Sequence, residues 1–549
     1  MPLQKNQVLT LQVERLSSDG SGVAHSPEGE TVFIPGAAPG DEARVRIVKD
    51  CKRYAFGILD EVLTPSPDRI PVDCAVAGPC GGCSLRHLDY AAELRAKQEN
   101  VADAFARIGG LDVPVLPIVG SPEIDRYRNK VQFPVGTDKA GRPCIGFYAG
   151  RTHRIVPCPD CRLQPGVLNE IGNTLCAFFA EKGIHPYNEE TGKGLVRHIF
   201  LRRGAHSGQI MVCLVCTRAK LPSAEELCTR LKEAFPDIVT ILLNVNAKNT
   251  NVILGSETHT LYGQGYIEDT LCGVPVQLGP LSFYQVNTLA AEQLYGIAAE
   301  YAQLTPDDLL LDLYCGMGTI GLSMADHCRE LVGVEIVPEA IESAKANAAR
   351  MGAAVSAKSR FFCADAGQAA AQLAAEGLHP DVVMLDPPRK GCDEATLSAV
   401  VRMAPRRVVY VSCNPATAAR DAAWLEQNGY HAEKVQPVDL FPRTKHVETV
   451  VLLSKGEIDS KKVRVEFSLE DMDMSEFQDG ATYPQIKEYV LEHTGLKVSN
   501  LYISQIKRKC GLEVGKNYNL PKSEDSRQPQ CPPEKEKAIR EAFKYFGMI

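Results

Sequence analysis

The first 63 residues alternate apolar and polar positions with a period of two, between glycines and prolines that mark turns. This period is typical of β-strands that bury one face. The alternation recurs in five short segments, so it predicts a small closed barrel of the type that binds oligonucleotides. An SH3-like barrel would give the same pattern.

The next part of the chain, residues 64–280, has a less regular pattern. The prolines of 64–74 indicate a linker, and a helix-like run follows over 89–110. Strand-like segments at 208–216 and 239–246 then indicate a mixed α+β region. No internal repeat or low-complexity tract is present in the sequence.

From residue 281 the pattern changes to apolar strands that alternate with helical stretches. That rhythm is typical of a doubly wound, Rossmann-like α/β sheet. The strand candidates are 309–316, 330–336, 381–388, 406–413 and 448–454.

Beyond residue 456 the composition becomes charged and helical, so the sequence predicts a multidomain protein. Its four parts are a β-barrel (1–63), an α+β central domain (64–280), a doubly wound α/β domain (281–456) and a helical appendage of open role (457–549). Segment 494–509 of the appendage has two interpretations. One is a helix–turn–helix with a basic second helix, and the other is an amphipathic helix with a solvated basic end.

Composition restricts the compartment and the partners. The chain has 549 residues, 44% of them apolar, and a net charge of −8, as expected of a soluble globular protein. It has neither a signal-peptide pattern nor an apolar run of about 20 residues, so we expect a cytoplasmic protein without a membrane partner. No protein partner is implied. In a reducing compartment, the 19 cysteines are expected to include metal or catalytic sites rather than disulfides.

A glycine loop follows the first strand of the α/β region, with the spacing Gly316-x-Gly318-x-x-Gly321. This spacing fits a dinucleotide site, with Glu335 as the ribose-binding acid, and it fits a loop for S-adenosyl-L-methionine. Asp312 favours the methyl donor, because a carboxylate there would repel a pyrophosphate but can pair with an amine. A nicotinamide-dependent dehydrogenase is the alternative.

Three later segments fit methylation of a pyrimidine at C5. Asp386 lies in an Asp-Pro-Pro-Arg turn at a strand end, where ligands bind in such sheets. Cys413 follows the next strand, and Glu448 begins the last one. C5 becomes nucleophilic only after a thiolate adds to C6, so this chemistry needs a cysteine, a base and a methyl donor. Taken singly, the three residues also fit an ordinary turn, a packing cysteine and a solvated acid.

Six segments in this order resemble the RNA uracil-5-methyltransferase family, namely 282–287, 311–322, 334–348, 385–391, 410–417 and 441–453. The resemblance covers the C-terminal catalytic domain and implies that Cys413 is the nucleophile and Glu448 the proton acceptor. It also implies S-adenosyl-L-methionine contacts from Gln285, Tyr314, Glu335 and Asp386. Asp365 is a further candidate, for an adenine contact.

A cysteine-rich loop, Cys74-x5-Cys80-x2-Cys83, indicates a metal site rather than core packing. Zinc and an iron–sulfur cluster both accept thiolates, and either Cys158 or Cys161 can supply a fourth ligand. The sequence is similar to the iron–sulfur branch of the same family. That similarity implies a [4Fe–4S] cluster held by Cys74, Cys80, Cys83 and Cys161, with a structural or RNA-positioning role.

The N-terminal barrel is similar to the TRAM domain of that branch, which implies RNA binding by basic residues of 44–53 and stacking of bases on Tyr54 or Phe56. The resemblance as a whole implies S-adenosyl-L-methionine-dependent methylation of uracil C5 in structured RNA, through a covalent adduct between Cys413 and C6. The TRAM-like barrel and the iron–sulfur cluster together indicate 23S ribosomal RNA as the substrate. The alternatives are a tRNA uracil-5-methyltransferase and a non-catalytic iron–sulfur RNA-binding protein.

Overall fold

The computed structural model describes residues 3–150, 152–248, 251–456, 483–494, 496, 498–510 and 531–545. The chain divides into two compact units, Met1–Ile458 and Asp459–Ile549, and each is described by itself. In the described part of the chain, every helix is too short or too polar to cross a membrane.

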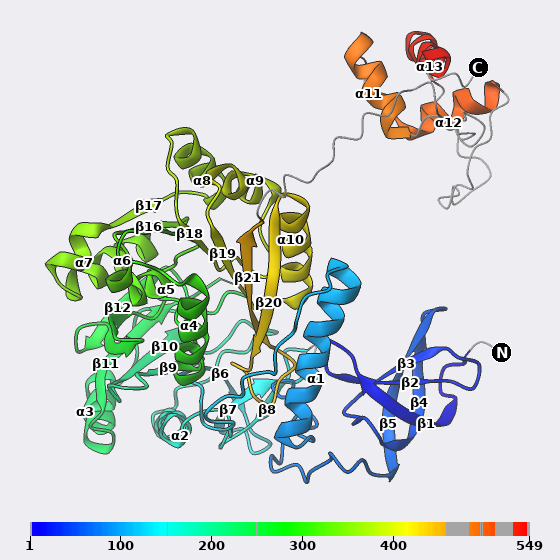
Figure 1. Ribbon diagram of the computed structural model, residues 1–549. Helices are drawn as coiled ribbons and strands as arrows, with labels where there is room; N and C mark the ends of the chain where they lie inside the picture. The colour runs from blue at the N-terminus through cyan, green and yellow to red at the C-terminus, as the bar shows by residue number, and fades with distance from the viewer. Residues whose placement is uncertain are drawn as a thin grey trace. The chain divides into compact units, whose positions relative to one another are not determined.

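Five strands near the N-terminus close into a barrel with the order β1-β2-β3-β5-β4. They are β1 (Val8–Leu16), β2 (Ser21–His25), β3 (Thr31–Pro35), β4 (Glu42–Asp50) and β5 (Tyr54–Thr64). Their alternating apolar residues fill the barrel, with Val13, Val32 and Val45 almost fully buried. The predicted barrel is therefore confirmed, and Figure 1 shows it in blue beside helix α1.

The central region is built on a seven-stranded sheet with the order β12-β11-β10-β9-β6-β7-β8. Its elements are β6 (Lys130–Thr137), β7 (Pro143–Tyr148), β8 (Ile155–Pro157), α2 (Gly166–Glu181), β9 (Val196–Arg203), β10 (Ile210–Cys216), α3 (Ala224–Ala234), β11 (Ile238–Val245) and β12 (Glu257–Tyr262). Helices α2 and α3 share one hydrophobic core with the sheet. Phe200 and Met211 belong instead to a second core, which joins the sheet to the α/β domain.

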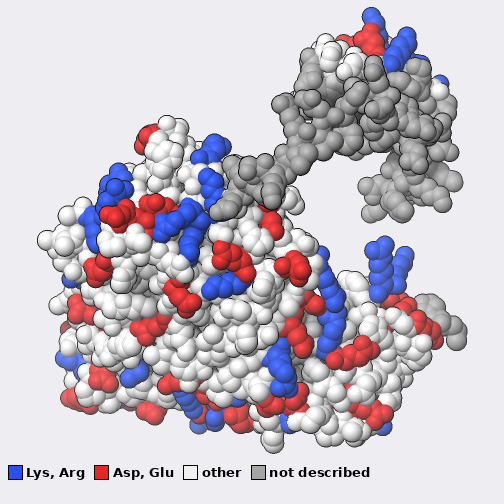
Figure 2. All heavy atoms as spheres, in the orientation of Figure 1, with Lys and Arg blue, Asp and Glu red and all other residues white. Residues whose placement is uncertain are grey.

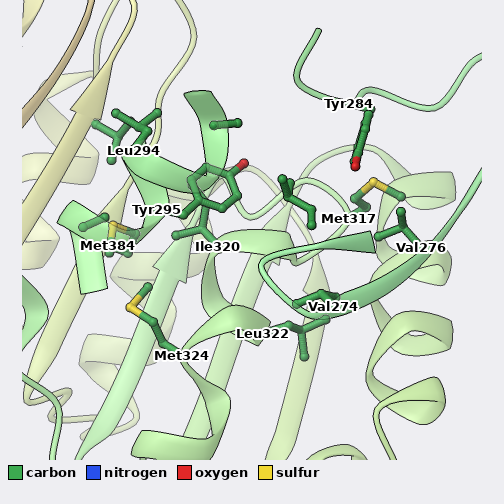
Figure 3. Close-up of a cluster of buried hydrophobic side chains, with 14 of the residues drawn as sticks. Val274, Val276, Tyr284, Leu294, Tyr295, Met317, Ile320, Leu322, Met324 and Met384 are labelled. Atoms are coloured by element: carbon green, nitrogen blue, oxygen red, sulfur yellow. The ribbon is translucent and has the colours of Figure 1, made fainter. Parts of the chain in front are cut away.

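A hairpin of β13 (Ile267–Leu271) and β14 (Val274–Leu278) lies at this junction. Figure 3 shows Val274 and Val276 of the hairpin among Tyr295, Met317 and other buried side chains of the α/β domain. The central sheet and the α/β domain therefore share a continuous apolar interior.

The α/β domain has the strand order β17-β16-β15-β18-β19-β21-β20, with its last two strands antiparallel to their neighbours. Its strands are β15 (Leu309–Leu313), β16 (Glu330–Glu335), β17 (Ser359–Cys363), β18 (Val382–Leu385), β19 (Arg407–Ser412), β20 (Tyr430–Val438) and β21 (Glu448–Lys455). Its helices are α4 (Thr288–Ala302), α5 (Thr319–Ser323), η2 (Ala325–His327), α6 (Pro338–Arg350), α7 (Ala353–Lys358), α8 (Ala366–Ala375), α9 (Glu394–Met403) and α10 (Pro415–Gln427). Two separate apolar cores, one on each face of the sheet, confirm the doubly wound architecture. Strands β17 and β20 were not among the predicted strands.

Helix α1 (Tyr90–Asp103) and the π-helix η1 (Ala104–Gly109) precede the central sheet in sequence but pack on the α/β domain. Val101 and Phe105 are buried in the core that contains α10. The following segment continues this contact, because the Leu116 amide donates to the Val435 carbonyl of β20. Figure 1 shows α1 running beside β20 and α10.

The connection between β20 and β21 is fixed through four consecutive carbonyl groups, those of residues 440–443. These carbonyls accept hydrogen bonds from four different parts of the chain, in order Asn287 Nδ2 (3.1 Å), Lys97 Nζ (3.1 Å), the Tyr127 hydroxyl (3.0 Å) and the Leu85 amide (3.1 Å). We call residues 440–443 the clamped segment. It ends five residues before Glu448, so it determines where β21 begins.

Lys97 is the centre of this arrangement. Its ammonium group lies 2.7 Å from Glu93 Oε1 and 2.8 Å from Asp439 Oδ1, and all three side chains are buried. The Tyr90 hydroxyl donates to Asp439 Oδ2, and Glu93 Oε1 also accepts the Arg443 amide at 2.7 Å. The Arg443 guanidinium also lies 3.7 Å from Glu93 Oε2, so removal of Lys97 would leave Asp439 without its cation and Glu93 with only this longer contact.

The second unit contains α11 (Tyr483–Thr494), α12 (Asn500–Lys509) and α13 (Pro533–Tyr545) around a small core that includes Ile503 and Phe543. The helical character predicted for this region is confirmed for these elements. Segment 494–509, with its two interpretations, contains α12, but residues 495 and 497 lie outside the described residues.

We predict that Lys97→Met lowers the free energy of unfolding by about 3–5 kcal/mol at neutral pH, because Asp439 would stay buried without a cation and Glu93 would keep only its longer contact with Arg443. The deficit should shrink as the pH falls below neutral, because burial raises the pKa of Glu93 and the protonated acid no longer needs a cation. Chemical denaturation over a pH series measures both effects. Lys345→Met, which removes an exposed lysine 2.9 Å from Glu342, should change stability by less than about 0.5 kcal/mol. Equal stability of the two variants would contradict this role of Lys97.

Candidate active site

The glycine loop joins β15 to α5 at the carboxyl edge of the α/β sheet. Gly316 and Gly318 have φ angles of 54° and 79°, in the left-handed region that favours glycine. A Cβ atom at Gly321 would lie 2.8 Å from Asp312 Oδ2, the atom that accepts the Gly321 amide at 3.0 Å. Backbone conformation and close packing thus account for all three glycines, and Asp312 shapes the loop.

Tyr314 and Glu335 lie on either side of this loop. Tyr314 adopts a φ of 66°, and its hydroxyl lies 3.3 Å from Thr396 Oγ1. Glu335 ends β16, and its carboxylate accepts the amides of Gly316, Ile336 and Val337 at 3.2, 2.8 and 3.0 Å. These bonds hold the Glu335 side chain in one orientation at the edge of the sheet.

Two other predicted ligand residues have different surroundings. Gln285 is half-buried before α4, and its backbone carbonyl accepts a 2.7 Å hydrogen bond from Asn129. Asp365 is the N-cap of α8, where its Oδ1 atom accepts the Gly367 and Gln368 amides at 3.1 and 3.2 Å. Capping explains an aspartate at position 365 without a ligand.

Strands β19 and β21 bring Cys413 and Glu448 together. Their antiparallel register pairs Ser412 with Thr449, so Cys413 and Glu448 are opposite each other one step further along. Asp386 follows β18, the neighbour of β19 on its other side. Three segments far apart in sequence therefore place a thiol and two carboxyl groups at one edge of the sheet.

This edge holds carboxyl groups that are costly to ionise. Burial raises the pKa of Asp386 to about 7. Burial, with smaller effects from Asp386 and Glu335, raises the pKa of Asp312 to about 8, and Asp312 Oδ1 has no hydrogen-bond partner. Burial, and then Asp386, raises the pKa of Glu448 well above its usual value, while Arg389 opposes the shift. Such a site favours a ligand that carries positive charge.

Arg389 is a functional candidate to which the sequence assigned no role. Burial and the nearby Glu448 raise the pKa of Cys413, whereas the Arg389 guanidinium lowers it. Burial, and then Arg389, lower the pKa of His446 to about 4, so His446 is neutral at neutral pH. Asn414 connects the two loops, because its side-chain amide donates to the Arg389 carbonyl at 3.0 Å. The sequence could have identified Arg389 as a candidate, because it lies in the same turn as Asp386.

The predicted cluster cysteines meet in one small cavity of about 90 Å³. Its lining includes Cys74, Cys80, Cys83, Cys158 and Cys161, together with Arg86, Arg128 and Arg162. Both candidates for the fourth ligand are present, so the lining does not choose between Cys158 and Cys161. Among the described residues, no three or more histidine, cysteine, aspartate or glutamate side chains form a group that could hold a metal ion. The iron–sulfur cluster therefore stays a prediction.

The barrel presents an aromatic cluster in which Tyr54 packs edge-on against Phe33 and Phe56, with ring centroids 5.7 and 5.6 Å apart. Two of the basic residues predicted to face phosphates are paired with acids, Arg44 with Glu61 and Arg46 with Asp60. Figure 2 shows basic and acidic side chains interspersed over the visible face of the first unit, so charge there is not gathered into one basic patch.

Two known families match this chain. Residues 2–59 match the TRAM domain, and residues 207–456 match the family described as tRNA (uracil-5-)-methyltransferase. An uncharacterized RNA methyltransferase of Halalkalibacterium halodurans is 44% identical over 453 residues, which are 82% of this chain and 98% of the relative. One from Clostridium tetani is 41% identical over 454 residues, 83% of this chain and 98% of the relative.

A solved structure is similar over most of the chain. It is the tRNA (uracil-54, C5)-methyltransferase of Pyrococcus abyssi in complex with S-adenosyl-L-homocysteine. The TM-score is 0.64 and the sequence identity is 28%, with 81% of this chain and 100% of that chain covered.

Proposed function

This chain belongs to the RNA uracil-5-methyltransferase family and is an S-adenosyl-L-methionine-dependent RNA methyltransferase; from that premise we propose that it methylates C5 of uridine in 23S ribosomal RNA. The observation that carries the proposed chemistry is the register of β19 and β21, which sets Cys413 opposite Glu448 beside Asp386. A thiol and a base at one sheet edge are what a C5 methylation needs.

Cys413 is the proposed nucleophile. Its thiolate Sγ would form a bond to C6 of the uracil, which moves an electron pair to C5 and makes that carbon nucleophilic. The Arg389 guanidinium favours this step, because it lowers the pKa of the thiol and offsets the effects of burial and of Glu448. The target uridine must leave its base stack to reach the sheet edge.

Glu448 is the proposed proton acceptor. After C5 has gained its methyl group, Glu448 would remove the C5 proton, and the electron pair of that bond would break the bond between Sγ and C6. The raised pKa of Glu448 suits this role, because a carboxylate with a higher pKa is a stronger base towards the C5 proton.

The residues around the glycine loop fit a methyl donor that carries positive charge. S-adenosyl-L-methionine supplies the methyl group, and the residues proposed to hold it are Gln285, Tyr314, Glu335 and Asp386. The unpartnered Oδ1 atom of buried Asp312 and the raised pKa values of Asp312 and Asp386 support this assignment. A cation beside these groups would favour their ionised forms.

The four predicted cluster residues also have surroundings that fit their proposed ligand. Cys74, Cys80, Cys83 and Cys161 line one cavity, and arginines in its wall would compensate the negative charge of thiolates. We propose that they hold a [4Fe–4S] cluster. When bound, the cluster would stabilise the loop that carries the first three cysteines.

Ribosomal RNA is proposed because this chain combines a TRAM barrel with the cysteine set, and that inference rests on analogy. Methylation of tRNA is the second candidate function. The matched family and the similar structure from Pyrococcus abyssi both carry tRNA in their names, which favours this candidate.

We predict that the protein, supplied with S-adenosyl-L-methionine, becomes covalently attached to a 23S ribosomal RNA transcript that contains 5-fluorouridine. Fluorine replaces the proton that Glu448 would remove, so the bond between Sγ and C6 cannot break. Denaturing gel electrophoresis detects the adduct. Cys413→Ala should form none, whereas Cys363→Ala, which removes an exposed thiol, should react like the unchanged protein. Without an adduct at Cys413 on this transcript or on a tRNA transcript that contains 5-fluorouridine, the proposed mechanism is wrong.

Glu448→Gln is expected to lower the turnover rate by about 100-fold or more and to accumulate the same adduct with unmodified RNA, since the thiolate can add but the proton stays. Transfer of a labelled methyl group and gel mobility report the two effects. The control is Glu433→Gln, which changes an exposed acid on β20 and should leave both unchanged. A Glu448→Gln protein with normal turnover would exclude Glu448 as the base.

For the cluster, we expect Cys161→Ser protein purified without oxygen to lose most of the iron and acid-labile sulfide of the unchanged protein. Cys158→Ser is the matched control, because the same change is made three residues away, and it should keep both. The opposite result would assign the fourth ligand to Cys158. Unchanged protein that contains no iron would contradict the cluster itself.

A further inference from the structure

The second unit lies outside the part of the chain that the relatives share. The relatives from Halalkalibacterium halodurans and Clostridium tetani match over 98% of their own lengths, but over only 82% and 83% of this chain. Both matched families lie within residues 2–456. The three helices of the second unit nevertheless bury Ile503, Ile539 and Phe543 in a core of their own. A compact unit beyond the shared enzyme is a candidate for a separate binding function.

Three aromatic rings gather where α11 and α13 meet. Tyr489 of α11 lies 4.0 Å from His493 and 4.5 Å from Tyr545 of α13, measured between ring centroids. The planes of the two tyrosine rings are 30° apart, so these rings are close to parallel. Tyr545 is 67% exposed, and a nucleic-acid base can extend the group of rings by stacking on it.

One face of α13 carries basic side chains towards this aromatic group. Lys537, Arg540 and Lys544 have the i, i+3, i+7 spacing of a single helix face, and they line an open hollow of about 490 Å³. The other face of α13 packs Ile539 and Phe543 into the core. Among the described residues, neither Lys537 nor Lys544 forms an ion pair.

The acidic residues of the hollow do not cancel this positive charge. Glu536 pairs with Lys509 at the end of α12 (2.6 Å) and with Arg540 (3.0 Å), so one carboxylate holds two cations side by side. The other acid in the lining is Glu541. A local excess of positive charge on a chain of net charge −8 indicates an anionic partner.

We propose that this face of the second unit binds a single-stranded segment of RNA, with a base stacked on Tyr545 and phosphates on Lys537 and Lys544. Single strands are bound by cations along the backbone and by aromatic side chains on which the bases stack. RNA is also the substrate class of this methyltransferase. An acidic segment of a protein would fit the basic residues, but it would not use the exposed aromatic ring. The proposal does not depend on which uridine is methylated.

The experiment irradiates the full-length protein with a labelled oligouridine strand that contains 5-iodouridine, and mass spectrometry then identifies the crosslinked peptides. A crosslink to Tyr545 is expected, because a photoactivated base reacts with the ring on which it stacks. Tyr545→Ala should remove this crosslink and leave those of the first unit unchanged, so they serve as the internal control. Tyr545→Phe keeps the ring and should keep the crosslink.

The yield of this crosslink against strand concentration gives the affinity of the second unit alone. Over a salt series, the double variant Lys537→Met/Lys544→Met should reduce the logarithmic slope by about 1.4, which corresponds to two phosphate contacts at about 0.7 each. Glu541→Gln removes an exposed acid from the same face and should tighten binding. The control Lys139→Met/Lys220→Met removes two exposed lysines from the first unit and should match the unchanged protein.

Two results would overturn the proposal. One is the lack of any crosslink to α11 or α13, or a crosslink whose yield and salt slope are the same in the lysine double variant. The other is a double variant that loses binding of a poly-glutamate peptide but keeps the RNA crosslink, which would assign the surface to an acidic protein. Crosslinking needs no methyl transfer, so this proposal and the 5-fluorouridine adduct at Cys413 can fail independently.

Discussion

The salt bridges of one buried lysine are the constraint on which the geometry of this active site depends. Lys97, on a helix that precedes the central sheet, compensates Glu93 and Asp439 and binds a carbonyl of the clamped segment. The clamped segment leads directly into β21, whose register with β19 sets Glu448 opposite Cys413. Residues more than 300 positions apart in sequence therefore cooperate to place the proposed base beside the proposed nucleophile.

The electrostatics of the active site match the methyl donor proposed for it. Acidic groups with raised pKa values, Asp312 and Asp386, lie at the carboxyl edge of the α/β sheet, where a cationic methyl donor is proposed to bind. Burial of these acids destabilises the protein alone, and a bound cation would compensate for it, as is common at functional sites.

The sequence predicted those features that depend on local pattern. The alternation of apolar and polar residues predicted the barrel. The apolar strands and the glycine loop predicted the α/β domain. Strand β20 was missed because charged and polar residues and Pro437 interrupt its apolar pattern, and β17 was missed because it is a largely exposed edge strand without a buried apolar run. The docking of α1 on the α/β domain was not predictable, since Glu93 and Lys97 have the spacing of an ordinary surface pair on a helix. Their burial depends on Asp439, which is more than 300 residues away. The role of Arg389 was overlooked, although this residue lies in the same turn as Asp386.

The central claim, that this protein makes 5-methyluridine in 23S ribosomal RNA, is tested most directly by measuring that nucleoside in separated RNA classes. Nucleosides from purified 23S ribosomal RNA and from purified tRNA are compared by mass spectrometry between cells with the protein and cells without it. We predict that 5-methyluridine disappears from at least one position of 23S ribosomal RNA in cells without the protein, while its level in tRNA is unchanged. Loss from tRNA alone, or no loss from either RNA, would contradict it.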